Sequence, residues 1–144
     1  MRNGDSVARS SLRIITIDNT DPAFYRLLGP LLARRDVHKS LGGPPWDDPG
    51  KQWTVAVATD TNGTERAAGF IGLTTTGALE SLWAETDHRH TLYHRLVAVA
   101  VKASDGRALH ATVTHARVAA YEQAGFRTVS TTANYAKMHR DPSA

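Results

Sequence analysis

Several short segments of the chain alternate between hydrophobic and polar positions or are rich in β-branched residues, and both patterns predict β-strands. Residues 12–17 are the first such segment, and residues 53–58 are the second. The Asn62-Gly63 pair that follows is a strong signal for a hairpin turn. Residues 67–75 and 78–86 then continue the pattern. We therefore expect an antiparallel meander in the first half of the chain.

Two other segments have apolar residues at helical spacing. Asp21-Pro22 predicts the start of a helix, because Asp caps a helix and proline suits its first position. Apolar residues follow at Phe24, Leu27, Leu28, Leu31 and Leu32. Pro30 interrupts this run, so we expect it to kink the helix or to begin a second one that carries Leu31, Leu32 and Val37. Residues 88–104 are the second segment and predict a long helix. Between the two helical segments, residues 42–50 are rich in glycine and proline and predict a loop.

The last quarter of the chain predicts a strand, a short helix and two more strands. Residues 108–113 form the strand, and the helix after it stops at Gly125, which suits the left-handed position beyond a helix end. Phe126 can fold back onto the last helical turn, and strands follow near residues 126–132 and 134–138. The whole order indicates an α/β layout with helices covering a mixed sheet. On these residues alone, Tyr121 either packs within the helix or places its phenol in a site.

The Tyr121-x-x-x-Gly125-Phe126 pattern followed by a strand resembles the last conserved block of the GNAT superfamily of N-acetyltransferases. The order of predicted elements is similar to the GNAT order along nearly the whole chain. The resemblance implies a GNAT fold with a mixed central sheet of six to seven strands and about four helices. We expect a flexible tail over residues 1–10 and a single domain over residues 11–144.

The resemblance also implies a reaction: direct transfer of an acetyl group from acetyl-CoA, or a related acyl-CoA, to a small-molecule or macromolecular amine. Tyr121 would be the acid that protonates the leaving sulfur. A backbone N–H of the fourth strand near Trp83 and Ala84 would stabilise the carbonyl oxygen. Glu80 is the candidate base, with Glu85, Asp87, His115 or an ordered water relay as alternatives.

The loop expected to hold the cofactor pyrophosphate departs from the GNAT pattern Arg/Gln-x-x-Gly-x-Gly/Ala. Asp87-His88-Arg89 is similar to the family's entry to this loop, with Arg89 at the first position, but Leu92 and His94 stand where glycine or alanine is usual. A helix start still offers N–H groups and a positive dipole. The expected cofactor-binding residues are Trp83, Ala84, Arg89, His90, Thr91, Leu92, Tyr93, His94 and Thr114.

The segment before Tyr121 departs from the family pattern, and the loop over residues 43–50 is a candidate entry for the acceptor. Thr114 and Arg117 replace the usual Asn-x-x-Ala before the tyrosine; Thr114 can cap the helix, and Arg117 either reaches a phosphate or an acidic substrate or lies in solvent. In this fold the acceptor often enters near the loop over residues 43–50. Trp46 there offers a stacking face, although a proline-stiffened loop with Trp46 covering the core is the preferred interpretation.

Composition narrows the classes of function. The 144 residues include no cysteine, which excludes disulfides, thiolate zinc sites and a cysteine nucleophile. We interpret His90 and His94 as surface histidines and expect no metal. No apolar run approaches a membrane span and Met1 to Ser11 lacks an apolar centre, so we expect a cytoplasmic protein. The net charge of +3 and pI near 9.5 suit an anionic partner, such as a phosphorylated cofactor or nucleic acid.

Two alternatives to an N-acyltransferase remain open from the sequence. Phage Mom-type proteins are GNAT relatives that modify DNA bases, and the missing glycines, the basic pI and Trp46 suit that role. A GNAT-like fold without catalysis, binding protein or nucleic acid, would also lose the glycine loop. Many GNAT relatives pair, so a homodimer is compatible with the resemblance.

Overall fold

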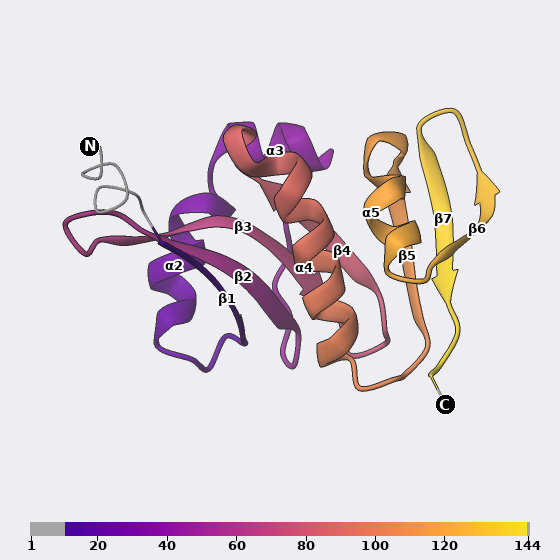
Figure 1. Cartoon of the computed structure of the whole chain (residues 1–144), viewed down its shortest axis with the longest axis horizontal. Coiled ribbons are helices and arrows are strands. Elements are labelled where there is room, and N and C mark those ends of the chain that lie inside the picture. The colour runs from indigo at the N-terminus through magenta and orange to yellow at the C-terminus, as the bar shows by residue number, and fades with distance from the viewer. Residues whose placement is uncertain (1–10, 144) are drawn as a thin grey trace, which may run out of the picture.

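The computed structural model describes residues 11–143 apart from the side chain of His88, so the predicted tail over residues 1–10 lies outside the described residues. The chain folds into two antiparallel sheets that lie side by side (Figure 1). The first has the order β1-β2-β3-β4, with β1 Ser11–Ile17, β2 Gln52–Thr59, β3 Glu65–Leu73 and β4 Leu79–Ala84. The second has the order β5-β7-β6, with β5 Leu109–Thr114, β7 Tyr135–Arg140 and β6 Arg127–Thr131.

The two sheets are joined by a parallel bridge between Ala78 and His110, at the beginning of β4 and β5. Beyond this bridge the two neighbouring strands belong to separate sheets. The mixed character expected of the sheet therefore resides in this β4–β5 junction, since every ladder within the two sheets is antiparallel.

Four α-helices occur among the described residues: α2 Ala23–Leu32, α3 Arg35–Leu41, α4 Arg89–Ala103 and α5 Val118–Gln123. The 3-10 turns η1 Thr86–His88 and η2 His115–Arg117 lead into α4 and α5. The alternative that Pro30 begins a second helix carrying Leu31 and Leu32 is wrong, because α2 continues through Pro30 to Leu32 and α3 begins only at Arg35. Pro30 lies on the exposed side of α2, where water can bond the carbonyl that proline leaves without a donor.

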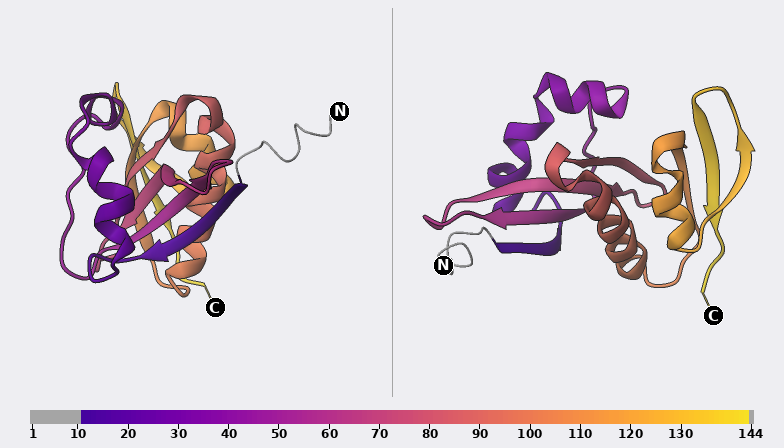
Figure 2. Two further views of the ribbon diagram at one scale, coloured as in Figure 1. Left: turned by 90° about the vertical axis from the view of Figure 1, so that its left-hand side faces the viewer. Right: turned by 45° about the horizontal axis from the view of Figure 1, so that its top comes forward.

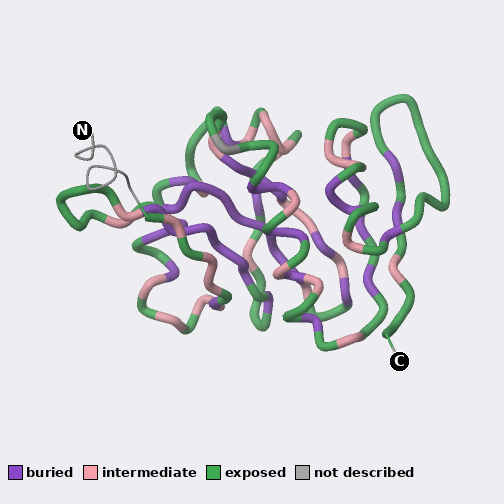
Figure 3. The backbone as a smooth tube through the Cα atoms, viewed as in Figure 1, coloured by how far each residue is buried: buried purple, intermediate pink, exposed green. Residues whose placement is uncertain are grey.

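The helices cover opposite faces of the first sheet and enclose two cores (Figures 2 and 3). On the face covered by α2 and α3, Phe24 and Leu28 pack with the aromatic residues of the strands. On the other face, α4 and α5 contribute Leu92, Leu96 and Tyr121 to a core shared by both sheets. Burial of these apolar side chains is the main favourable term in folding, and it holds the second sheet beside the first.

The helix that carries Tyr121 ends as the sequence predicts. Gly125 has φ +96°, in the left-handed region, and its N–H donates to the carbonyl of Glu122. The N–H of Phe126 donates to the carbonyl of Tyr121 at 3.1 Å, and the two rings meet edge to face with centroids 5.3 Å apart. Phe126 thereby fixes the last turn of α5 and the ring of Tyr121 within it.

Replacing Gly125 by alanine should lower the free energy of unfolding by about 1–3 kcal/mol, because a residue with a Cβ is strained at this positive φ. An added Cβ would also lie 3.1 Å from Nε of Arg140, which donates to the carbonyl of Ala124. Urea unfolding measures the change. Gly29→Ala is the matched control, because a Cβ in that helical position meets no atom within 4 Å and should stabilise the chain. Equal stability of Gly125→Ala and the unaltered chain would contradict the prediction.

Candidate active site

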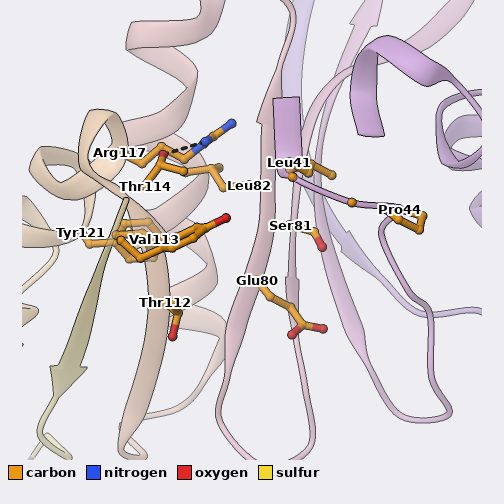
Figure 4. A pocket seen from close by; sticks show the side chains of 13 residues that line it. Leu41, Pro44, Glu80, Ser81, Leu82, Thr112, Val113, Thr114, Arg117 and Tyr121 are labelled. Carbon is orange, nitrogen blue, oxygen red and sulfur yellow. Dashed lines mark hydrogen bonds between the residues drawn. The ribbon is translucent and has the colours of Figure 1, made fainter. Parts of the chain in front are cut away.

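A pocket lies where β4 and β5 part (Figure 4). Its volume is about 230 Å³. Residues 80–82 of β4 form one wall, and residues 112–114 of β5 form the other. The loop that follows α3 contributes residues 41–44, and Arg117, Tyr121 and Tyr135 complete the lining. The parting of two parallel strands thus creates a cavity that both halves of the chain line.

The β4 wall contains a β-bulge at Ser81. The pairing steps from Phe70–Trp83 to Gly72–Glu80, so the single residue of β3 between these pairs faces two residues of β4, Ser81 and Leu82. Ser81 has φ +62°, an uncommon value for a residue with a side chain. A bulge of this kind leaves backbone groups outside the ladder. It places such groups in the wall of the pocket, where an N–H can stabilise a developing negative charge.

Tyr121 enters the pocket from α5 and is only 1% exposed. Among the described residues, its hydroxyl has no hydrogen-bonding partner. Burial raises the pKa of the Tyr121 phenol well above its usual value of 10.0, and this effect outweighs the opposing influence of the nearby Arg117 cation. The phenol therefore keeps its proton across the neutral range, as a proton donor must.

Glu80 lines the same pocket from the opposite strand, β4. Its Oε1 accepts a hydrogen bond at 2.6 Å from Nζ of Lys51, a residue that is fully buried. Lys51 also donates to the carbonyl of Trp46 at 2.5 Å and lies 4.5 Å from the centre of the Trp53 ring. Gly72 makes room for this lysine, because a Cβ there would collide with Cε of Lys51. Lys51 is not among the residues predicted from the sequence, although a lysine at the start of an apolar strand was the available signal.

The loop before β2 is anchored by hydrogen bonds to the body of the protein. Asp47 accepts from the indole N–H of Trp53 at 2.9 Å and from the amide of Asn19 at 3.0 Å. Trp46 is 70% exposed, so the interpretation that it covers the core is wrong. Trp53 takes the core position instead, because its ring is enclosed while its N–H still reaches Asp47. The exposed ring of Trp46 is left on the surface of a fixed loop.

Arg117 and Thr114 lie at the α5 end of the pocket (Figure 4). The expectation that Thr114 caps the helix is wrong: its hydroxyl makes no cap hydrogen bond and instead accepts from Nη1 of Arg117 at 2.9 Å. Nη2 of Arg117 donates to the carbonyl and the hydroxyl of Ser40, at 3.2 and 3.1 Å. The guanidinium lies 5.1 Å from the centre of the Tyr93 ring. Arg117 is therefore a structured link between α5 and α3, not a side chain in solvent.

The predicted cofactor residues at the start of α4 lie outside the pocket lining. Arg89, His90 and Thr91 are exposed on the first turn of the helix. Leu92 is 1% exposed and packs into the core, so its side chain does not cover the helix start. Tyr93 is buried beneath Arg117. The rings of His90 and His94 are 5.2 Å apart, and Nδ1 of His94 is buried without a hydrogen-bonding partner.

Trp83 and Ala84 do not line the pocket either. They pair with Phe70 and Gly69 in the regular part of β4, and the Trp83 ring packs on the α2 side of the sheet. The backbone N–H expected near them lies in regular strand pairing, and the irregular backbone of β4 is found at Ser81.

The alternative bases lie elsewhere. Glu85 pairs with Arg66 at 3.1 Å, Asp87 is exposed, and Nε2 of His115 is 3.1 Å from the carbonyl of Thr132. None of the three lines the pocket, which leaves Glu80 as the carboxylate among its described lining residues.

Over the described part of the chain, no group of three or more His, Asp or Glu side chains is placed to hold a metal ion. No described helix has the length and apolarity needed to cross a membrane.

The sequence matches no protein-family model and no curated protein. Solved structures do resemble it. An acyl-CoA N-acyltransferase from Pseudomonas aeruginosa superposes with a TM-score of 0.60 at 15% identity, over 90% of this chain and 99% of that one. A mutant of the spermidine N-acetyltransferase SpeG from Vibrio cholerae gives 0.52 at 13% identity, over 89% of this chain and 92% of that one. A chimera of SpeG with hSSAT gives 0.52 at 14% identity, over 90% and 94%. The chain thus has the fold of these N-acyltransferases, the GNAT fold that the sequence pattern predicts.

Proposed function

We propose that the protein is an N-acyltransferase that moves an acyl group from an acyl-CoA to a primary amine. The observation that carries this proposal is the meeting of three elements in one pocket: a protonated Tyr121, the Glu80 carboxylate and a β-bulge at Ser81. They lie where β4 and β5 part, in a fold shared with an acyl-CoA N-acyltransferase and a spermidine N-acetyltransferase. A small amine acceptor fits the size of the cavity.

The residues around the pocket suit an acyl-CoA. Leu82 and Val113 offer apolar contacts inside the cavity. Arg89 and Thr91 are exposed at the start of α4, where N–H groups and the helix dipole favour a pyrophosphate. Leu92 leaves this surface clear because it packs inward. These two places would hold the acyl end and the phosphate end, respectively.

When bound, the thioester supplies an activated carbonyl and a thiolate leaving group. Glu80 accepts the proton of the acceptor amine, with Lys51 holding one carboxylate oxygen in place. A backbone N–H at the Ser81 bulge stabilises the negative charge that develops on the carbonyl oxygen. Tyr121 donates its hydroxyl proton to the leaving sulfur. The two proton transfers thus occur on opposite walls of the pocket.

Acetyl-CoA at a hundredfold excess over its Kd should stabilise the protein by about 2.7 kcal/mol, seen as a rise in Tm. Release of free thiol in the presence of a panel of primary amines should then report turnover. Adenosine 3′,5′-bisphosphate, which lacks the thioester arm, separates nucleotide binding from binding of the whole cofactor. An unchanged Tm at millimolar acetyl-CoA would refute the proposal and favour the non-catalytic binding module.

A further inference from the structure

The guanidinium of Arg117, which lines the pocket, has only neutral partners among the described residues. Arg117 bonds two hydroxyl groups, one carbonyl and the face of an aromatic ring. It makes no ion pair with any described carboxylate, and its Nε is buried without a hydrogen-bonding partner. A buried polar atom without a partner costs free energy, so the position is not explained by packing within the chain alone.

The charges around the cavity do not cancel. Glu80 is the negative group among the described lining residues, and its carboxylate already faces the fully buried ammonium of Lys51 at 2.6 Å. This pair leaves no net charge, and the guanidinium of Arg117 remains as the excess. Figure 4 shows that guanidinium extending into the gap between the two halves of the protein. The pocket is therefore electropositive at its α5 end.

A guanidinium suits a carboxylate or a phosphate, because two parallel N–H···O bonds can form to two oxygens of the anion. The hydroxyl of Ser40 beside it can add a donor once Arg117 turns toward the ligand. The same cavity includes Glu80 and the loop over residues 41–44, whereas the start of α4 lies outside it. An anion at Arg117 would thus belong to the acceptor rather than to the cofactor phosphates.

We propose, resting on the function above, that Arg117 makes this pocket selective for acceptor amines that carry a carboxylate or phosphate. An amino acid or an aminoalkyl phosphate would place its anion on Arg117 and its amine toward Glu80. The corresponding amine without the anion leaves the guanidinium with only its neutral partners. A polyamine brings further positive charge to an end of the pocket that already has an excess.

Matched pairs of acceptors that differ only in the anion test the proposal: L-ornithine against putrescine, L-phenylalanine against phenethylamine, and phosphoethanolamine against ethanolamine. The anionic member of each pair should have a kcat/KM about tenfold or more above its partner. Arg117→Gln should remove this preference, and Arg117→Lys should retain part of it because the charge remains. Arg127→Gln is the control, since Arg127 is exposed and pairs with Asp141 at the far edge of the second sheet.

Calorimetry of the same pairs with the protein alone gives a readout that does not depend on turnover. Tighter binding of the anionic member, and loss of that difference in Arg117→Gln, would support the proposal. If acyl transfer is not detected in the same experiments, the proposed function fails while the binding preference stands. Equal kcat/KM or equal affinity within the pairs would overturn the proposal while leaving acyl transfer standing. A weaker affinity for acetyl-CoA in Arg117→Gln, with the acceptor preference intact, would assign Arg117 to the cofactor and also overturn it. The pairs compared on the unaltered protein decide the question if Arg117→Gln does not fold.

Discussion

Replacing Tyr121 by phenylalanine should lower kcat by about a hundredfold or more, the usual contribution of a positioned general acid. The phenol lies in the pocket wall and is protonated at neutral pH, since its usual pKa of 10.0 is raised further by burial. The substitution removes one oxygen atom that has no partner among the described residues, and the ring keeps its contact with Phe126. We therefore expect little change in the free energy of unfolding.

Steady-state kinetics with acetyl-CoA and an accepted amine measure the effect. KM for both substrates should stay close to that of the unaltered enzyme, because the lost interaction acts in the transition state. Phe126→Leu is a control for packing alone, since it disturbs the ring contact and leaves the hydroxyl in place. Equal kcat for the Tyr121→Phe enzyme and the unaltered one would remove Tyr121 from the mechanism.

The same variant separates the ionisation of Tyr121 from that of other groups. Burial raises the pKa of the folded-state phenol above 10.0, so the unfolded chain ionises first as the pH rises. The resulting stability is fully present below pH 10.0 and is lost as the pH increases beyond it. We expect the free energy of unfolding, measured with urea at pH 8 and again above pH 10, to fall less between the two pH values for Tyr121→Phe than for the unaltered protein. Parallel losses would contradict the burial of this phenol.

The elements that local patterns define could be predicted from the sequence. The left-handed stop at Gly125 and the hairpin at Asn62-Gly63 depend on backbone preferences of one or two residues, and both occur in the structure. The resemblance to the GNAT pattern predicts Tyr121 and Glu80 as site residues, and the fold brings both into one pocket. The two residues are far apart in the sequence, but the order of the strands in the GNAT fold brings them together.

The missed features depend on contacts between distant segments. Arg117 bonds Ser40, and Lys51 bonds Glu80, so neither partner is visible in a local window. A bulge shifts the period of β4 at Ser81, which a regular alternation cannot reveal. The resembling cofactor pattern places Leu92 at a glycine position of the pyrophosphate site, whereas the helical spacing over residues 88–104 predicts a helix, and Leu92 packs in the core one turn before Leu96. Here the helical period was the better guide, because burial of an apolar side chain outweighs the pattern.

Replacing Glu80 by glutamine should lower the free energy of unfolding by about 2–3 kcal/mol, because it leaves the buried ammonium of Lys51 without a carboxylate. This value lies below the usual cost of breaking a buried pair, since 43% of the Glu80 side chain is exposed and water can reach its end. Lys51→Met should cost less, because the Glu80 carboxylate that it leaves unpaired is partly exposed to water, and the double variant should recover most of the loss, because it contains no buried charge without a partner. Urea unfolding of the four proteins gives the coupling energy. A coupling near zero would contradict the dependence of Lys51 on Glu80.

The same four proteins separate the structural role of Glu80 from a chemical one. If the carboxylate served only to neutralise Lys51, the double variant would regain turnover together with stability. We expect instead that the double variant is stable and still slow, because no carboxylate remains among the described lining residues to accept the proton of the amine. Lys51→Met alone keeps that carboxylate but loses the contact that holds it, so its kcat should lie between those of the Glu80→Gln variant and the unaltered enzyme. Full turnover in the double variant would assign the proton transfer to water and leave Glu80 as the partner of a buried lysine.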